Sequence, residues 1–120
     1  MNFLWEPGAI VPAADVVLEH APVPPEQVVE GAPRVGFAVL GETDLGGRVV
    51  EVGVWECTPG VSTDTEADEV FVVISGAARI DFIEPERRSI TVGPGDVVQL
   101  AAGMQTVWTV TETLRKVYVA

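Results

Sequence analysis

The sequence contains few of the residues that carry redox, metal and nucleic-acid chemistry. Cys57 is the only cysteine and His20 the only histidine among 120 residues, so no intrachain disulfide can form. Seven lysine and arginine residues stand against 18 aspartate and glutamate residues, which gives a formal net charge of −11. Because binding to phosphate groups requires clustered basic side chains, we expect neither nucleic acid nor an anionic membrane as a partner.

Long hydrophobic runs are also missing. The apolar run Phe71–Ile74 has the length of a strand, whereas a membrane-spanning helix needs about 20 residues. Near the N-terminus the chain carries the acidic Glu6 where a signal peptide would carry basic residues. A lone cysteine also fits a reducing compartment. We therefore predict a cytoplasmic protein without a membrane span.

What the sequence does contain is enough for one folded domain. A chain of 120 residues with 48% hydrophobic content can bury a single core. Six of the nine prolines fall in the first 34 residues, where they remove amide donors and interrupt regular pairing. We therefore expect an N-terminal arm over residues 1–34 and a body over residues 35–120.

The arm is too apolar to be a solvated tail. We expect it to pack on its own body or on a partner subunit, and either the arm or an exposed edge strand predicts a homodimer. Its apolar side chains include Phe3, Leu4, Trp5, Ile10 and Val11.

The body shows short β-branched runs separated by glycine or proline, the pattern of an antiparallel sandwich or barrel. We predict an all-β jelly-roll barrel without a convincing helix, since the best helical candidate, Ala13–His20, is short and flanked by prolines. The predicted strands are Val35–Leu40, Arg48–Cys57, Glu69–Ser75, Ala77–Ile83, Arg88–Val92, Asp96–Leu100, Gln105–Thr111 and Leu114–Val119.

Three turns are predicted between these strands. Ser75-Gly76 supplies a residue that accepts positive φ, and Glu84-Pro85-Glu86 provides a second reversal. The third is the segment Gly93-Pro94-Gly95-Asp96. Between the strands ending at Cys57 and beginning at Glu69 we expect a loop.

Two glycine-bounded modules resemble the two motifs of the cupin superfamily. The first runs from Trp55-Glu56-Cys57-Thr58-Pro59-Gly60 to Asp68-Glu69 and an apolar run ending at Gly76, and the second begins at Gly95-Asp96. With the ending Trp108 through Arg115-Lys116-Val117-Tyr118-Val119, residues 50–119 are similar to the ureidoglycine aminohydrolase-like and ethanolamine-utilisation-like cupins. The resemblance implies the cupin double-stranded β-helix.

The resemblance also implies a metal held by three histidines and a glutamate, and here the sequence departs from it. Counting back from Gly76 places the glutamate at Glu69 and the first two histidine positions on Ser62 or Thr63 and on Asp64 or Thr65. Counting forward from Gly60 places them on Glu66 and Asp68. In the second motif, Ala101 replaces the usual proline and Thr106 the third histidine. Because hydroxyls are weak ligands for transition metals, we expect no metal and no other cofactor.

One alternative for a cation stays open. A hard cation prefers oxygen ligands, and the segment Asp64–Glu69 supplies four carboxylates. The competing interpretation is a solvated acidic loop. The four residues concerned are Asp64, Glu66, Asp68 and Glu69.

Strand alternation places the candidate residues of each strand on one face of that strand. The resemblance implies that the inward positions line a central cavity with an aromatic wall, where Glu69 and Lys116 would face each other as general base and electrostatic partner. Such a pair would suit an amino acid-like or hydroxy-acid-like ligand. Alternatively, the aromatics are core and the two charges form a structural ion pair. The candidate ligand-binding residues are Trp55, Glu69, Phe71, Thr106, Trp108, Lys116 and Tyr118.

Cys57 shares a predicted strand face with Trp55. Flanked by Glu56 and Thr58, and far in sequence from His20, the thiol is a poor candidate nucleophile. It is typical of a small buried apolar residue, and the sequence leaves open whether it faces the cavity.

Three functions are compatible with this pattern. The first is a metal-independent cupin that binds a small molecule. The second is an enzyme of the aminohydrolase or isomerase kind, and the third is a structural dimeric barrel whose pocket has no ligand.

Overall fold

The computed structural model describes residues 5–120, so Phe3 and Leu4 lie outside the described residues. Within that range nine strands join in one antiparallel sheet, which confirms the predicted all-β fold. In chain order the elements are η1 (Ala13–Asp15), β1 (Ala21–Pro22), η2 (Pro25–Gln27), β2 (Val28–Glu30), β3 (Arg34–Leu45), β4 (Arg48–Cys57), β5 (Gly60–Thr65), β6 (Glu69–Glu84), β7 (Arg87–Val92), β8 (Val97–Leu100) and β9 (Gln105–Val119).

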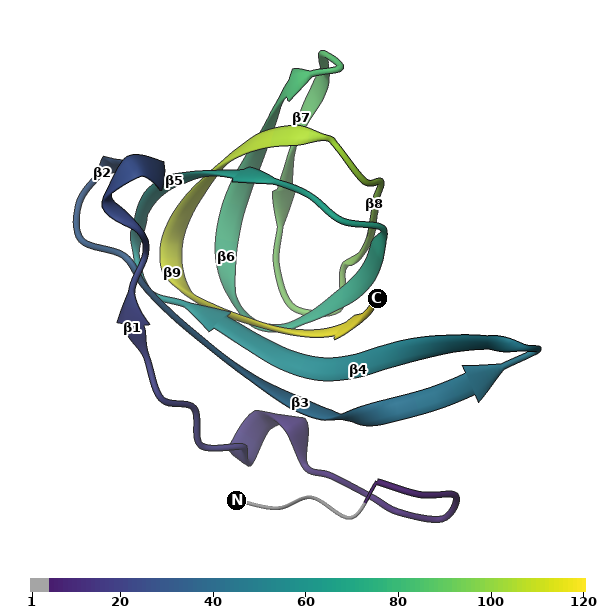
Figure 1. Ribbon diagram of the computed structural model, residues 1–120. Helices are drawn as coiled ribbons and strands as arrows, with labels where there is room; N and C mark the ends of the chain where they lie inside the picture. The colour runs from purple at the N-terminus through teal and green to yellow at the C-terminus, as the bar shows by residue number, and fades with distance from the viewer. Residues whose placement is uncertain (1–4) are drawn as a thin grey trace.

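The sheet curls into a barrel around its longest strands. β9 pairs with β4, β5 and β6, and β6 also pairs with β7 and β8. The β3–β4 hairpin continues beyond the barrel, as Figure 1 shows. Because β9 contacts three strands, its inward side chains meet residues from β4, β5 and β6.

One of the predicted reversals is confirmed and two are wrong. The chain reverses at residues 85–86 between β6 and β7. At Gly93–Asp96 it makes a tight turn, where the Gly93 amide donates to the Asp96 carboxylate over 2.8 Å, but it does not reverse, because β7 and β8 both run antiparallel to β6. At Ser75-Gly76 the chain does not reverse: β6 runs on with shifts in register. Gly76 has φ of +89°, and a Cβ there would collide with the Thr113 carbonyl. Glycine therefore allows a sharp bend within one strand rather than a turn between two.

Two further strand predictions need correction. Residues 105–119 form the single strand β9 instead of two, and residues 60–65, expected as loop, form β5 between β9 and β2. β5 escaped prediction because it carries one large apolar side chain, Val61, among polar residues.

The core lies inside the curl of the sheet. Its most buried large side chains are Phe71, Ile80 and Leu114. Gln99 and Gln105, by contrast, are exposed. Within residues 5–120, none of the helices has the length and apolar character needed to cross a bilayer.

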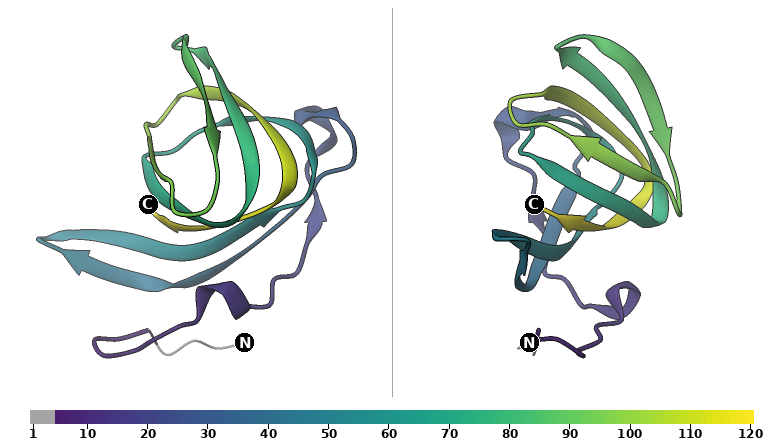
Figure 2. Two further views of the ribbon diagram at one scale, coloured as in Figure 1. Left: turned by 180° about the vertical axis from the view of Figure 1, so that it is seen from behind. Right: turned by 90° about the vertical axis from the view of Figure 1, so that its right-hand side faces the viewer.

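A second, smaller apolar cluster joins the N-terminal segment to the outside of the sheet. Val16 and Leu18 are buried against Leu40 and Val54, and Trp5 packs at the edge of this cluster. The segment therefore packs on its own barrel, along β3 and β4 (Figures 1 and 2). Within Ala13–His20 the described chain forms only the single 3-10 turn Ala13–Asp15 and then continues in extended form.

Candidate functional site

A cavity of about 290 Å³ opens at one end of the barrel. Its walls come from β4, β5, β6 and β9, and the N-terminal segment and the start of β3 form one side. The lining residues are Val23, Pro24, Gln27, Val35, Phe37, Trp55, Cys57, Ser62, Thr63, Asp64, Glu66, Glu69, Trp108, Lys116 and Tyr118.

Lys116 is the central charged group of the cavity. Its Nζ donates to Glu69 Oε2 over 2.7 Å, and its side chain is almost completely buried. The ammonium also lies 4.6 Å from the ring centroid of Trp55, 4.2 Å from that of Phe71 and 5.0 Å from that of Trp108. A cation over aromatic faces is stabilised by their quadrupoles, most strongly where water is excluded. The ammonium is thus held by one carboxylate and three aromatic rings.

The strand register explains this arrangement. Lys116 on β9 pairs with Trp55 on β4 and with Val73 on β6. Because side chains alternate along a strand, Trp55 and Lys116 point into the barrel while their neighbours Glu56 and Arg115 point outward. The centroids of Trp55 and Trp108 are 5.7 Å apart, so the two indoles form a continuous wall.

A pair of carboxyl groups, from Asp64 and Glu66, also lines the cavity. Glu66 Oε2 accepts hydrogen bonds from Thr106 Oγ1 over 2.7 Å and from Trp108 Nε1 over 2.9 Å, and the residue is 9% exposed. Asp64, at the mouth, is solvent-accessible, but protein atoms crowd its carboxyl group. Desolvation, followed by the charge of Glu66, raises the pKa of Asp64 to about 6, and Lys116 opposes the rise. Asp64 therefore titrates close to neutral pH.

Two further titratable side chains line the cavity. Burial raises the pKa of the Cys57 thiol to about 11 against the opposing charge of Lys116, so the cysteine is a neutral thiol that faces the cavity. Tyr118 donates to Glu51 Oε2 over 2.8 Å. Desolvation, that hydrogen bond and nearby carboxylates all raise the pKa of Tyr118.

The structure places the predicted site residues in two groups. Five line the cavity: Trp55, Glu69, Trp108, Lys116 and Tyr118. Phe71 and Thr106 lie behind the lining, where Phe71 contacts the Lys116 ammonium and Thr106 holds Glu66. These two therefore support the wall of the cavity.

Sequence reasoning missed the partners of Glu66 and the contribution of the N-terminal segment. The sequence leaves Glu66 either in a solvated acidic loop or among the ligands of a hard cation, yet it is buried, directly after the strand β5 that pairs with β9. Spacing alone gives no signal for this pairing, since Glu66 and Trp108 are 42 residues apart. Val23, Pro24 and Gln27 were likewise assigned only to the arm.

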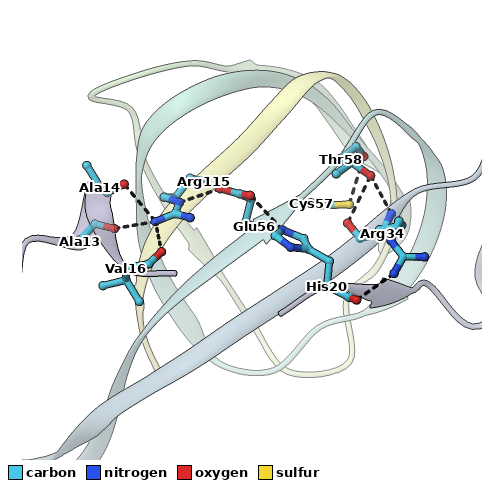
Figure 3. Close-up of polar contacts among 9 residues, drawn as sticks. All are labelled: Ala13, Ala14, Val16, His20, Arg34, Glu56, Cys57, Thr58 and Arg115. Carbon is cyan, nitrogen blue, oxygen red and sulfur yellow. Dashed lines mark hydrogen bonds and ion pairs between the residues drawn. The ribbon is translucent and has the colours of Figure 1, made fainter. Parts of the chain in front are cut away.

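The arm is fastened to the barrel by a cluster on the outer face, opposite the cavity (Figure 3). Arg115 Nη1 donates to the carbonyls of Ala13, Ala14 and Val16 over 2.9, 3.2 and 2.8 Å. Its Nε donates to Glu56 Oε2 over 2.7 Å. One guanidinium therefore binds three arm carbonyls while a carboxylate neutralises its charge.

The rest of the outer cluster holds the arm where it turns toward the cavity. His20 Nε2 lies 2.9 Å from Glu56 Oε1, and Arg34 Nη2 donates to the His20 carbonyl over 2.9 Å. The Arg34 amide donates to Thr58 Oγ1 over 2.8 Å. The outer cluster, made of Arg115, Glu56 and His20, thus fixes the segment that leads to Val23, Pro24 and Gln27.

The site does not fit the metal centre that the resemblance implies. At the retained glutamate position, the Glu69 carboxylate is bonded to the Lys116 ammonium, and at the third histidine position the Thr106 hydroxyl is bonded to Glu66. The carboxylate is thus already bound to an ammonium, and a hydroxyl is a weak ligand for a transition metal.

The hard-cation alternative also lacks the required convergence. Among residues 5–120, no three side chains of histidine, cysteine, aspartate or glutamate are placed to hold an ion together. Asp68 accepts a hydrogen bond from the Ala102 amide over 2.9 Å, and Glu69 is bound to Lys116.

Comparison with known proteins identifies the family. The model of the EutQ-like cupin domain matches residues 46–118, more than half of the chain. No curated protein matches the chain.

Several solved structures share the fold. A protein of unknown function from Pseudomonas syringae is 25% identical with a TM-score of 0.69; the match covers 88% of this chain but 44% of that one, so this chain spans less than half its length. A putative ethanolamine utilization protein from Salmonella typhimurium is 23% identical (TM-score 0.58; 72% and 68% covered). A cupin superfamily protein from Desulfitobacterium hafniense is 15% identical (TM-score 0.62; 100% and 94% covered).

Proposed function

We propose, since the chain belongs to the EutQ-like cupin domain family, that it binds a small molecule in the barrel cavity without the help of a metal ion. The observation that carries the proposal is the convergence of two indoles and four charged side chains on one cavity of about 290 Å³. Small-molecule sites have this composition: a concave, partly aromatic surface with a few placed polar groups.

Metal independence is supported by the way the central charges are satisfied. In the family's usual site a metal ion would neutralise the glutamate, whereas here the Lys116 ammonium lies 2.7 Å from Glu69. An ammonium tethered to β9 is present in every folded molecule and needs no loading. The barrel is therefore ready to bind a ligand as soon as it folds.

The first experiment is native mass spectrometry of the purified protein, followed by ligand titration of the tryptophan fluorescence. Trp55 and Trp108 line the cavity, so a ligand that enters it should change their emission. We expect binding to survive dialysis against a chelator. Trp5 lies on the outer face, so the variant Trp5→Phe is a matched control that should retain the fluorescence response.

If a chelator removes a bound transition metal and ligand binding is lost with it, the metal-independent proposal is wrong. A protein that binds no compound of a broad metabolite collection would favour the structural role, in which the cavity has no ligand.

A second function, an aminohydrolase or isomerase, is favoured by one observation: Asp64 has a pKa of about 6. A carboxyl group that titrates near neutral pH can both accept and release a proton during catalysis. In this alternative Glu69 is the general base and Lys116 its electrostatic partner, as the sequence predicts. We expect a turnover rate whose pH dependence follows a group titrating near pH 6. The variant Glu69→Gln should abolish this turnover.

We further propose a homodimer formed through the edge of β3. The arm residues Val16 and Leu18 are buried on their own barrel, whereas Ile10 and Val17 of the arm are exposed. Phe37, Val39 and Leu45 are exposed as well, on a strand whose outer edge pairs with β1 only at Arg34 and Val35. Exposed apolar edge strands are common association sites. Light scattering should give a dimer mass that Val39→Lys lowers to the monomer mass, whereas a monomeric parent protein would rule the dimer out.

A further inference from the structure

We infer that the ligand of this cavity is a small organic cation, a primary amine or an amidine, whose N–H groups bind the carboxyl groups of Asp64 and Glu66. The inference rests on the proposed binding function and names the ligand class. It also departs from the expectation of an acid-like ligand, which the sequence alone suggested.

The charges that face the cavity are unbalanced. Three carboxyl groups line it, from Asp64, Glu66 and Glu69, and among its described lining residues Lys116 is the only basic side chain. An anionic ligand would therefore enter a surface with excess negative charge, and a cationic ligand would reduce that excess.

Lys116 does not offset this negative charge for an incoming anion, because its ammonium is already paired with other side chains. The ammonium bonds to Glu69 over 2.7 Å and lies within 5.0 Å of the ring centroids of Trp55, Phe71 and Trp108. Reaching a ligand carboxylate would require it to leave these partners.

Asp64 and Glu66, in contrast, have no basic partner among the described residues. Glu66 accepts hydrogen bonds from the neutral donors Thr106 and Trp108, which fix the carboxylate without cancelling its charge. They fix the Glu66 carboxylate before a ligand arrives, so it is preorganised. Two carboxyl groups that line one cavity are suited to a forked or multiple N–H donor.

The ionisation of Asp64 gives this arrangement a measurable consequence. Its pKa is raised to about 6 by desolvation and by Glu66. A cation bound between the two carboxyl groups favours the ionised form of Asp64, so it lowers that pKa. Near pH 6, binding should therefore release protons, whereas an anion bound at the same place would take them up.

The cavity volume limits the size of the ligand. About 290 Å³ lies at the small end of the range of roughly 300–1,000 Å³ for small-molecule sites. Trp55 offers an apolar wall on one side. A short carbon chain or a single ring with one cationic group fits this description.

The test compares three compounds with one carbon skeleton, 1-aminobutane, butanoate and 1-butanol, by isothermal titration calorimetry on the full chain. We expect the amine to bind at least about tenfold more tightly than the carboxylate. Titrations near pH 6 in two buffers of different ionisation enthalpy should show proton release with the amine.

Three variants locate the interaction. Asp64→Asn and Glu66→Gln should each weaken amine binding by about tenfold or more, the usual effect of losing a charge-assisted hydrogen bond. Asp68→Asn is the matched control, because Asp68 belongs to the same acidic segment but does not line the cavity. It should change the affinity less than about twofold. Asp64 is accessible at the mouth, so its variant should fold even if Glu66→Gln does not.

The outcomes separate the inference from the proposed function. Tighter binding of butanoate or 1-butanol than of the amine overturns the inference and leaves a small-molecule site. Equal loss of affinity in Asp68→Asn also overturns it, because the effect would then be one of overall charge. If none of the three compounds binds, the inference fails, and the broad metabolite collection then decides whether the proposed binding function stands.

Discussion

The Lys116 ammonium and the Glu69 carboxylate form a buried ion pair, 2.7 Å long, between β9 and the first residue of β6. The two partners are not equally buried: the lysine side chain is 6% exposed and the glutamate side chain 17%. A buried charge that loses its partner cannot recover the hydration it gave up on folding. The pair should therefore respond differently to the removal of each member.

The first prediction follows from this asymmetry. Glu69→Gln removes the carboxylate partner of the buried ammonium and should lower the free energy of unfolding by about 3–5 kcal/mol. Lys116→Met should cost about 1–3 kcal/mol, because Glu69 can reach water and a thioether packs well against indoles. Urea unfolding measures both values. A larger loss in Lys116→Met than in Glu69→Gln would contradict this account of the pair.

The second prediction concerns the outer cluster. Arg115→Lys keeps the positive charge but cannot bind three carbonyls and Glu56 together, so it should cost about 2–3 kcal/mol. The loss should be local. Hydrogen exchange should accelerate in the arm segment around Ala13–Val16 more than in β6 or β9.

A surface arginine supplies the control for this experiment. Arg79→Lys alters an exposed ion pair with Asp81 and should cost less than about 1 kcal/mol. Because Val23, Pro24 and Gln27 follow the outer cluster and line the cavity, Arg115→Lys should also weaken ligand binding. Unchanged exchange in the arm would show that Arg115 does not fasten it.

The third prediction is a pH dependence of stability. The pKa of Asp64 is raised to about 6 in the folded state, so between about pH 4 and pH 6 the folded chain binds more protons at this position than the unfolded chain. The contribution of Asp64 to stability should therefore fall as the pH rises through this window. The difference in unfolding free energy between the parent and Asp64→Asn, measured at several pH values, isolates this contribution. A difference that is constant with pH would contradict the raised pKa.

The sequence predicts the fold well because its strongest signals are local. β-branched runs and glycine turns mark β3, β4, β7 and β8, and these signals depend on neighbours in the chain. The errors occur where tertiary contacts, rather than neighbours in the chain, determine the local structure. At Gly76 a residue typical of turns allows a bend, and β5 forms although Ser62 and Asp64 replace the apolar residues expected on an inward face.

The same distinction holds for the candidate site. Alternation along strands places Trp55, Trp108 and Lys116 on inward faces, and the structure brings them together. The position of Glu66 depends on which strand lies beside β5, and the position of the arm depends on Arg115. Both relationships join residues far apart in the chain, for which hydrophobic periodicity carries no information. Polar residues on an inward strand face are themselves a sign of a functional surface.

The last prediction uses Cys57 as a reporter of the cavity. Its thiol has a pKa of about 11, because burial outweighs the charge of Lys116, and the residue is almost inaccessible to solvent. Near pH 8 its thiolate fraction is about a hundredfold below that of an ordinary cysteine, so alkylation by iodoacetamide should be slowed at least as much. The same protein in urea, where the cavity no longer exists, should react at the rate of a free thiol. Since Cys57 lines the cavity beside Trp55 and Lys116, a bound ligand should slow the reaction of the folded protein further. Rapid alkylation of the folded chain would mean that the thiol is accessible to the reagent and that its pKa is raised less than its burial requires.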